Sequence, residues 1–155
     1  MSDTTSSSGQ TIYTSRPLHA EYVSGQSQLV GDKIHTITVK LKKSGTPSGL
    51  AQIGVFNTDL SVKKLFATLD VSTLTTDYLE YTFTLSAGDS YIIQSGDRIG
   101  VKYASGDSKT NISIMRDTDT ADPFDGINSY LTYYQNQWKN TTTSDLYMKL
   151  TQTGP

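Results

Sequence analysis

The sequence predicts an all-β protein, a two-sheet antiparallel β-sandwich of the jelly-roll type. Short segments such as 79–85 alternate apolar and polar residues, and this period of two is the signature of a half-buried strand. Turn sequences rich in glycine and aspartate, such as Ala87-Gly88-Asp89 and Ser95-Gly96-Asp97, separate the segments. No segment keeps a helical period for more than a turn, and strands recur roughly every 8–12 residues, as in sandwiches.

Composition places the chain in one domain and excludes several partners and sites. A chain of 155 residues supports a single core. Its net charge of −2 gives no reason to expect nucleic acid, and its densest basic run, Lys40, Lys42 and Lys43, reads as the solvated face of a strand. The absence of cysteine excludes thiolate metal sites and disulfides. No apolar run approaches the roughly 20 residues of a membrane span, so we expect no membrane insertion.

The balance of residue types indicates an extracellular or cell-surface protein. Thr, Ser, Gly, Asn and Tyr are abundant, whereas only 18% of residues are charged. Residues 1–11 are polar and lack apolar anchors, so we expect a disordered Ser/Thr-rich linker followed by a single module over 12–153. Because no signal-peptide core follows Met1, we expect a multidomain parent protein that carries the export signal elsewhere.

The expected elements follow the alternation along the chain. Leu18–Val23 is expected as an edge strand, because Pro17 precedes it. A single helical turn is expected at 70–74, capped by Asp70 or Ser72. The other expected strands are 34–43, 51–57, 62–69, 79–85, 99–103, 111–116, 129–134, 137–139 and 145–151. The predicted core comprises Ile37, Val39, Leu41, Ile53, Val55, Tyr81, Phe83, Leu85, Ile99, Val101, Ile112, Ile114, Leu146, Met148 and Leu150.

Three stretches carry a family resemblance: Ala51–Thr84, Tyr91–Tyr103 and the closing segment 144–152. Together they resemble jelly-roll modules of secreted and cell-surface proteins of archaea, thaumarchaeal ones above all, and of bacteria. The resemblance spans about 18–152 and rests on strands and turns. It implies a jelly-roll fold and a noncatalytic carbohydrate-binding or adhesion role, and it identifies no binding residue.

No catalytic constellation is present, so we expect no enzyme. The two histidines, His19 and His35, have no serine or carboxylate at a recognisable catalytic spacing, and His35 shares the apolar face of its strand. The two glutamates, Glu21 and Glu80, lie in strands without a supporting motif for glycoside hydrolysis.

An irregular segment, 116–129, concentrates four aspartates that suit a structural calcium ion. Calcium binds six to eight hard oxygen ligands. The candidate ligands are Asp117, Asp119, Asp122 and Asp125. The pattern lacks the glutamate and order of an EF-hand loop, and aspartate beside threonine, proline and glycine is also ordinary turn chemistry, so both interpretations stay open.

Aromatic residues gather around an expected short hairpin at 129–139. Flat rings stack on the C–H faces of sugars, and Tyr and Trp add hydrogen bonds. The candidate ligand-binding residues are Trp138, Tyr130, Tyr133, Tyr134, Gln135, Asn136 and Gln137. Strand alternation allows at most half of the tyrosines to be exposed, and the others belong to the core. We therefore expect a polysaccharide-binding module; the alternative is a structural or adhesive surface domain that assembles with other proteins.

Overall fold

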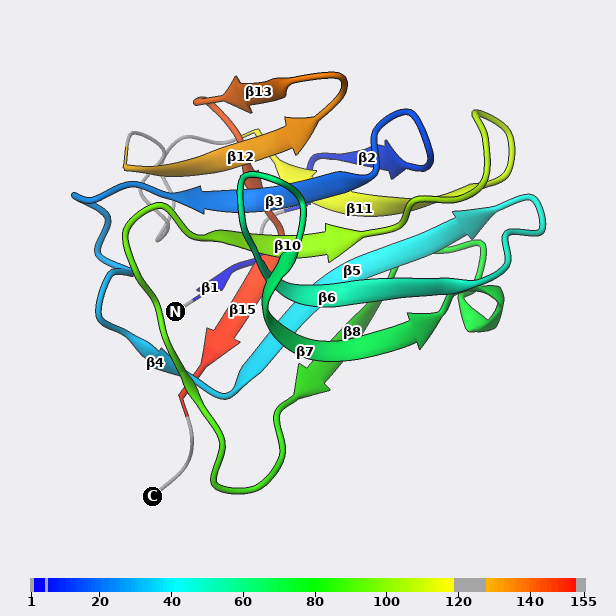
Figure 1. The fold of residues 1–155 in the computed structure, drawn as a ribbon. Coiled ribbons are helices and arrows are strands. Elements are labelled where there is room, and N and C mark those ends of the chain that lie inside the picture. Colours follow the sequence, from blue (N-terminus) through cyan, green and yellow to red (C-terminus); the bar gives the residue numbers. More distant parts are fainter. Residues whose placement is uncertain (1, 5, 119–127, 153–155) are drawn as a thin grey trace.

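A computed structural model describes residues 2–4, 6–118 and 128–152, and within them the chain is an all-β sandwich (Figure 1). The seven-stranded sheet contains β1 (Ser2–Asp3), β2 (Ser8–Ile12), β5 (Thr36–Ser44), β8 (Leu79–Thr84), β11 (Asn111–Asp117), β14 (Asp145–Leu146) and β15 (Met148–Thr151). The six-stranded sheet contains β3 (Leu18–Val23), β6 (Leu50–Phe56), β7 (Val62–Asp70), β10 (Arg98–Lys102), β12 (Ser129–Tyr134) and β13 (Trp138–Thr141). A separate pair joins β4 (Lys33–Ile34) to β9 (Tyr91–Ile92).

The one helical element of the described residues is the 3-10 turn η1 (Val71–Thr73), which begins where the sequence predicts. Asp70 caps it, because its Oδ1 accepts the Ser72 backbone N–H at 3.0 Å. In these residues no helix has the length and apolar character needed to cross a lipid bilayer.

The six-stranded sheet runs in the order β13-β12-β3-β10-β6-β7, and all its pairings are antiparallel. The prediction that 18–23 lies at an edge is wrong, because β3 pairs with β12 on one side and β10 on the other. Pro17 precedes the strand, so its missing N–H removes no hydrogen bond from either ladder.

The expected linker contributes strands to the seven-stranded sheet. Ser8–Ile12 pairs with β11, and Ser2–Asp3 pairs with β15. The prediction of a disordered segment over 1–11 therefore does not hold for these residues. Ile12, fully buried, lies just beyond the polar run and anchors it. Main-chain hydrogen bonds to β11 offset the entropy of ordering the rest.

The core lies between the two sheets and draws on both. Of the predicted core residues, all are buried except Tyr81, which is partly buried and packs against the cluster. Thr38 is also buried, although it faces away from the core beside its neighbours on β5. Its hydroxyl lies 2.7 Å from the Thr82 hydroxyl on the adjacent strand. The prediction of which residues face the core is therefore confirmed. The burial of Thr38 does not contradict it, because β5 lies between neighbouring strands that cover this side chain.

Candidate functional site

The outer face of the six-stranded sheet, which points away from the core, carries the candidate site. Directly paired residues of antiparallel strands share a face. Arg98 of β10 pairs with Tyr22 of β3, and Tyr22 pairs in turn with Tyr130 of β12. The next residue along β10, Ile99, is fully buried in the core, so the row of Arg98 lies on the opposite face.

Five side chains on this face form a continuous series of ring and guanidinium contacts, which we call the aromatic ladder. The rings of Tyr130 and Tyr22 have centroids 5.2 Å apart. The guanidinium carbon of Arg98 lies 4.9 Å from the Tyr22 ring and 4.3 Å from the Trp138 ring. Tyr134 meets Trp138 edge-on, at 5.6 Å and 77°. All five side chains are half-buried, so the ladder keeps part of its surface open to a ligand.

Arg98 is the only charged member of the aromatic ladder. One of its terminal nitrogens, Nη1, donates to the Gly96 carbonyl at 3.3 Å, while the buried Nε has no hydrogen-bond partner among the described residues. None of the three ion pairs found in that part of the chain includes it. Burial lowers the pKa of Arg98, and the nearby Tyr22 and Tyr130 raise it in part. Arg98 is therefore a partly desolvated cation without an acidic partner in the described part of the chain.

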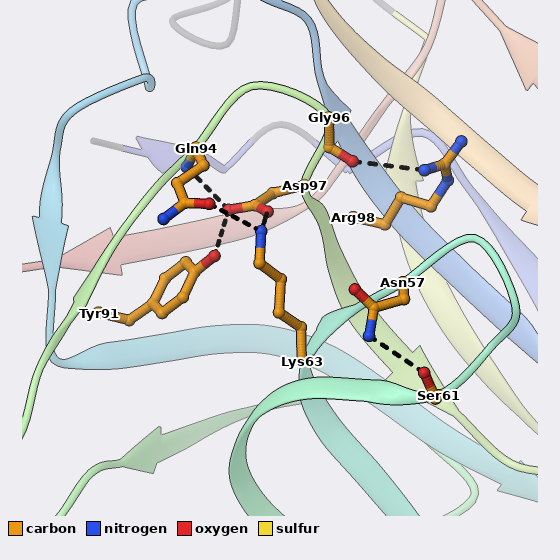
Figure 2. A network of polar contacts seen from close by, with 8 residues as sticks. All are labelled: Asn57, Ser61, Lys63, Tyr91, Gln94, Gly96, Asp97 and Arg98. Atoms are coloured by element: carbon orange, nitrogen blue, oxygen red, sulfur yellow. Dashed lines mark hydrogen bonds and ion pairs between the residues drawn. The ribbon is translucent and has the colours of Figure 1, made fainter.

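The turn before β10 is held by Asp97, whose carboxylate is 1% exposed (Figure 2). Its Oδ1 accepts Lys63 Nζ at 2.6 Å, and its Oδ2 accepts the Tyr91 hydroxyl at 2.6 Å and the Gln94 backbone N–H at 2.8 Å. Burial, the hydrogen bond to Asp97 and the charge of that carboxylate all raise the pKa of Tyr91. Asp97 thus engages Lys63 rather than the adjacent Arg98, whose guanidinium points away from this network (Figure 2).

The loop that joins β6 to β7, residues 57–61, crosses the outer face (Figure 1). Its first and last residues are joined by a main-chain hydrogen bond of 2.9 Å and a side-chain bond of 3.0 Å (Figure 2). Trp138 Nε1 donates to the Thr58 carbonyl at 2.9 Å, and Lys102 Nζ donates to the Leu60 carbonyl at 3.0 Å. The loop is therefore tied to the aromatic ladder at one point and to β10 at another.

A shallow hollow of about 330 Å³ opens on the same face beside Lys102. Lys102 pairs with Leu18 and Gln52, so it lies four residues along β10 from Arg98 and on the same side. The hollow is lined by Leu50, Gln52, Thr68, Lys102, Ala104 and Ser105. These side chains offer an amide, two hydroxyls and a cation, which suit the hydroxyl groups of a polar ligand.

Gly100 keeps the middle of this face flat. A Cβ at this position would lie 2.0 Å from the His19 carbonyl oxygen and 2.6 Å from Ala20 Cα, both main-chain atoms of β3. Only glycine therefore allows β10 to lie this close to β3 between Arg98 and Lys102.

The structure divides the residues that the sequence pattern assigns to ligand binding. Tyr130, Tyr134 and Trp138 belong to the aromatic ladder. Tyr133 lies on the opposite face of β12, where its ring stacks on His19 at 5.1 Å and 7°. The remaining three, Gln135, Asn136 and Gln137, form the hairpin turn, in which Asn136 adopts a φ of 64° and is exposed together with Gln137.

Sequence reasoning missed two members of the ladder, Tyr22 and Arg98. Arg98 occupies a polar alternating position of β10, which marks it as facing away from the core. Tyr22 shares a strand face with the apolar residues Leu18 and Ala20, so alternation alone would direct it to the core. Nothing local to β3 or β10 shows that these strands are neighbours, so no sequence signal joins either residue to Trp138.

Of the four candidate calcium ligands, Asp117 lies in the described residues, while Asp119, Asp122 and Asp125 lie outside them. Asp117 is fully buried at the end of β11, accepts a hydrogen bond from Ser7 Oγ at 3.1 Å and pairs in register with Asp145, which is also fully buried. The described part of the chain contains no group of three or more metal-ligating side chains.

The two histidines lie apart from the ladder. His19 is fully buried on the inner face, and neither of its ring nitrogens has a hydrogen-bond partner among the described residues. Burial, followed by the charges of Arg16 and Arg116, lowers the pKa of His19 to about 3. His35 Nδ1 lies 2.9 Å from the Asp89 carbonyl oxygen.

No protein-family model, curated protein or solved structure matches this chain. The fold and the candidate site therefore define the class of this protein: it is an antiparallel β-sandwich whose six-stranded sheet carries aromatic side chains and an arginine on its outer face.

Proposed function

We propose that this protein is a noncatalytic module that binds a polysaccharide on the outer face of its six-stranded sheet. The observation that carries the proposal is the aromatic ladder, which brings Trp138 together with Tyr22, Tyr130 and Tyr134 around Arg98. The partly exposed rings of this ladder offer stacking surfaces for sugar rings. The hollow beside Lys102 lies on the same face, and its Gln52, Thr68 and Ser105 side chains would bind neighbouring sugar hydroxyls.

The expected affinity is weak, because few rings are available and each is only partly exposed. Stacking adds about 1 kcal/mol per ring beyond area burial, so we expect a Kd of roughly 10 µM to 1 mM. The extracellular location stays part of the proposal and is supported by composition. A structural calcium ion is also proposed. Its ligands would be Asp117, Asp119, Asp122 and Asp125, because closely spaced carboxylates supply the hard oxygen ligands that calcium binds.

The test is retention on a panel of insoluble and soluble polysaccharides, measured by pull-down and affinity electrophoresis. Trp138→Ala should abolish retention on the polysaccharide. The far-UV circular dichroism spectrum should stay unchanged, because the Trp138 side chain is only half-buried. Trp138→Phe keeps a ring and loses the Nε1 bond to Thr58, so it should retain part of the binding. Tyr78→Ala is the matched control, because the Tyr78 ring also lies 4.9 Å from a cation, Lys42, which belongs to β5 in the other sheet.

Assembly with other proteins is the alternative role, and two exposed leucines on edge strands favour it. Leu65 on β7 is 41% exposed and Leu79 on β8 is 48% exposed. β7, however, contains two register shifts and two lysines, features that protect an edge from pairing with another chain. If the unaltered protein binds no polysaccharide of the panel, the assembly role replaces the carbohydrate-binding one.

A further inference from the structure

We infer that the polysaccharide bound on the outer face is acidic, and that Arg98 recognises the carboxylate of its uronic acid residues. This inference rests on the proposed function and specifies its ligand. Three features of Arg98 support it: how its guanidinium is held, which acceptors it has, and what lies further along β10.

Two aromatic rings lie close to the guanidinium of Arg98, and because its Nε is buried, the terminal nitrogens are the donors left for a ligand. Tyr22 and Trp138 both lie within stacking distance, at 4.9 and 4.3 Å. Stacking restrains the plane of the guanidinium, so less entropy is lost when its edge binds a ligand. A planar fork with N–H donors along its edge matches the two oxygens of a carboxylate, whereas a neutral hydroxyl satisfies only one donor.

The local acceptors do not satisfy this cation. Its one hydrogen bond in the described residues is the 3.3 Å contact to the Gly96 carbonyl. The nearest carboxylate in sequence, Asp97, is held by Lys63, Tyr91 and the main chain of Gln94. Burying a cation without a counter-ion is unfavourable, and an anionic ligand would offset that cost when it binds.

A second cation on the same face favours a polymer over a single sugar acid. Lys102 lies four residues from Arg98 along β10, which separates their Cα atoms by ~13 Å. Lys102 Nζ donates to the Leu60 carbonyl, and the side chain lines the open hollow. After the hydrogen bonds from Ser61, the charge of Lys102 also contributes to lowering the pKa of the nearby Asp59. A chain with a carboxylate on every residue offers a partner to each cation, and linked contacts raise the affinity without new interactions at either one.

The test compares polygalacturonate with its fully methyl-esterified form, which keeps the sugar rings and removes the charges. We expect the unaltered protein to bind the acid about ten- to a hundredfold more tightly by calorimetry, with the preference shrinking as salt is added. Arg98→Gln should bind both forms alike, and Arg98→Lys should recover only part of the preference. Lys42→Gln, which removes a ring-stacked cation from the other sheet, should behave as the unaltered protein does.

Each other outcome contradicts a defined part of the inference. Equal binding of acid and ester overturns the acidic ligand and leaves the polysaccharide-binding proposal standing, whereas binding of no polysaccharide overturns both. Dextran sulfate or poly-L-glutamate bound as tightly as polygalacturonate shows general anion binding and also overturns the inference. Because Arg98→Gln removes a stacked side chain, its melting temperature is measured first. The comparison of acid with ester needs no variant and stands alone if Arg98→Gln does not fold.

Discussion

Lys63 Nζ lies 2.6 Å from Asp97 Oδ1, and this contact joins an edge strand to a turn 34 residues further along the chain. The two partners differ in exposure. The Asp97 side chain is 1% exposed, whereas that of Lys63 is 32% exposed. Lys63 can therefore turn into water if its partner is lost, whereas the Gln94 N–H is fixed in place by the main chain of the turn.

Asp97→Ala should accordingly destabilise the protein far more than Lys63→Met. The first change leaves the Tyr91 hydroxyl and the Gln94 N–H without an acceptor, at a cost of about 2–4 kcal/mol. The second removes a partly exposed ion pair worth about 0–1 kcal/mol. Urea unfolding of both variants measures the difference. Equal losses would mean that the ion pair, and not the network around Asp97, holds the turn. Because that turn places Arg98, Asp97→Ala should also weaken polysaccharide binding.

His19 should make the protein less stable in mildly acidic solution. Its pKa is about 3 in the folded protein, against an ordinary value of 6.5, so the unfolded chain binds more protons between these two values. Stability from this group is therefore fully present above pH 6.5, declines as the pH falls below it and levels off near pH 3. Between pH 7 and 5.5 we expect a loss of about 1 kcal/mol.

The check for His19 is denaturant unfolding at pH 7 and pH 5.5, where carboxylates still contribute little. His19→Phe keeps a ring against Tyr133 and has no group to protonate, so its stability should fall less over the same interval. The inference concerns the difference between the two proteins, because His35 is present in both. Parallel curves for the two proteins would show that His19 is accessible to protons in the folded state.

Removal of calcium should lower the melting temperature if the proposed ion is bound. An ion that binds only the folded state stabilises it by mass action, by about 2.7 kcal/mol at a hundred times the Kd. For a chain of this size that corresponds to roughly 5–10 °C. The measurement is a thermal melt of calcium-loaded protein with and without excess chelator. Asp117→Asn should remove the response, because Asp117 is the buried candidate ligand on β11. A melting curve that is identical with and without chelator would contradict the proposal of a calcium site.

Local alternation was enough to predict the fold class and most of the core. In β5, Ile37, Val39 and Leu41 are apolar at every second position, and all three are fully buried. The same period identified β11 and the hairpin of β12 and β13. These features are readable because burial of one strand face depends only on residues that are adjacent in the sequence. The polar strand β2 escaped prediction because its order comes from main-chain pairing with β11, which leaves no pattern in its side chains.

The candidate site was predicted only in part, for the same physical reason. The sequence alone gathered Trp138, Tyr130 and Tyr134, because one hairpin holds all three. Tyr22 and Arg98 join them through the order of β13, β12, β3 and β10 in the sheet. Strand order is set by how the whole chain packs, and the pairing of distant strands leaves no local signal. The sequence thus determined a β-sandwich and its core, and the tertiary structure decided which rings meet around a single arginine.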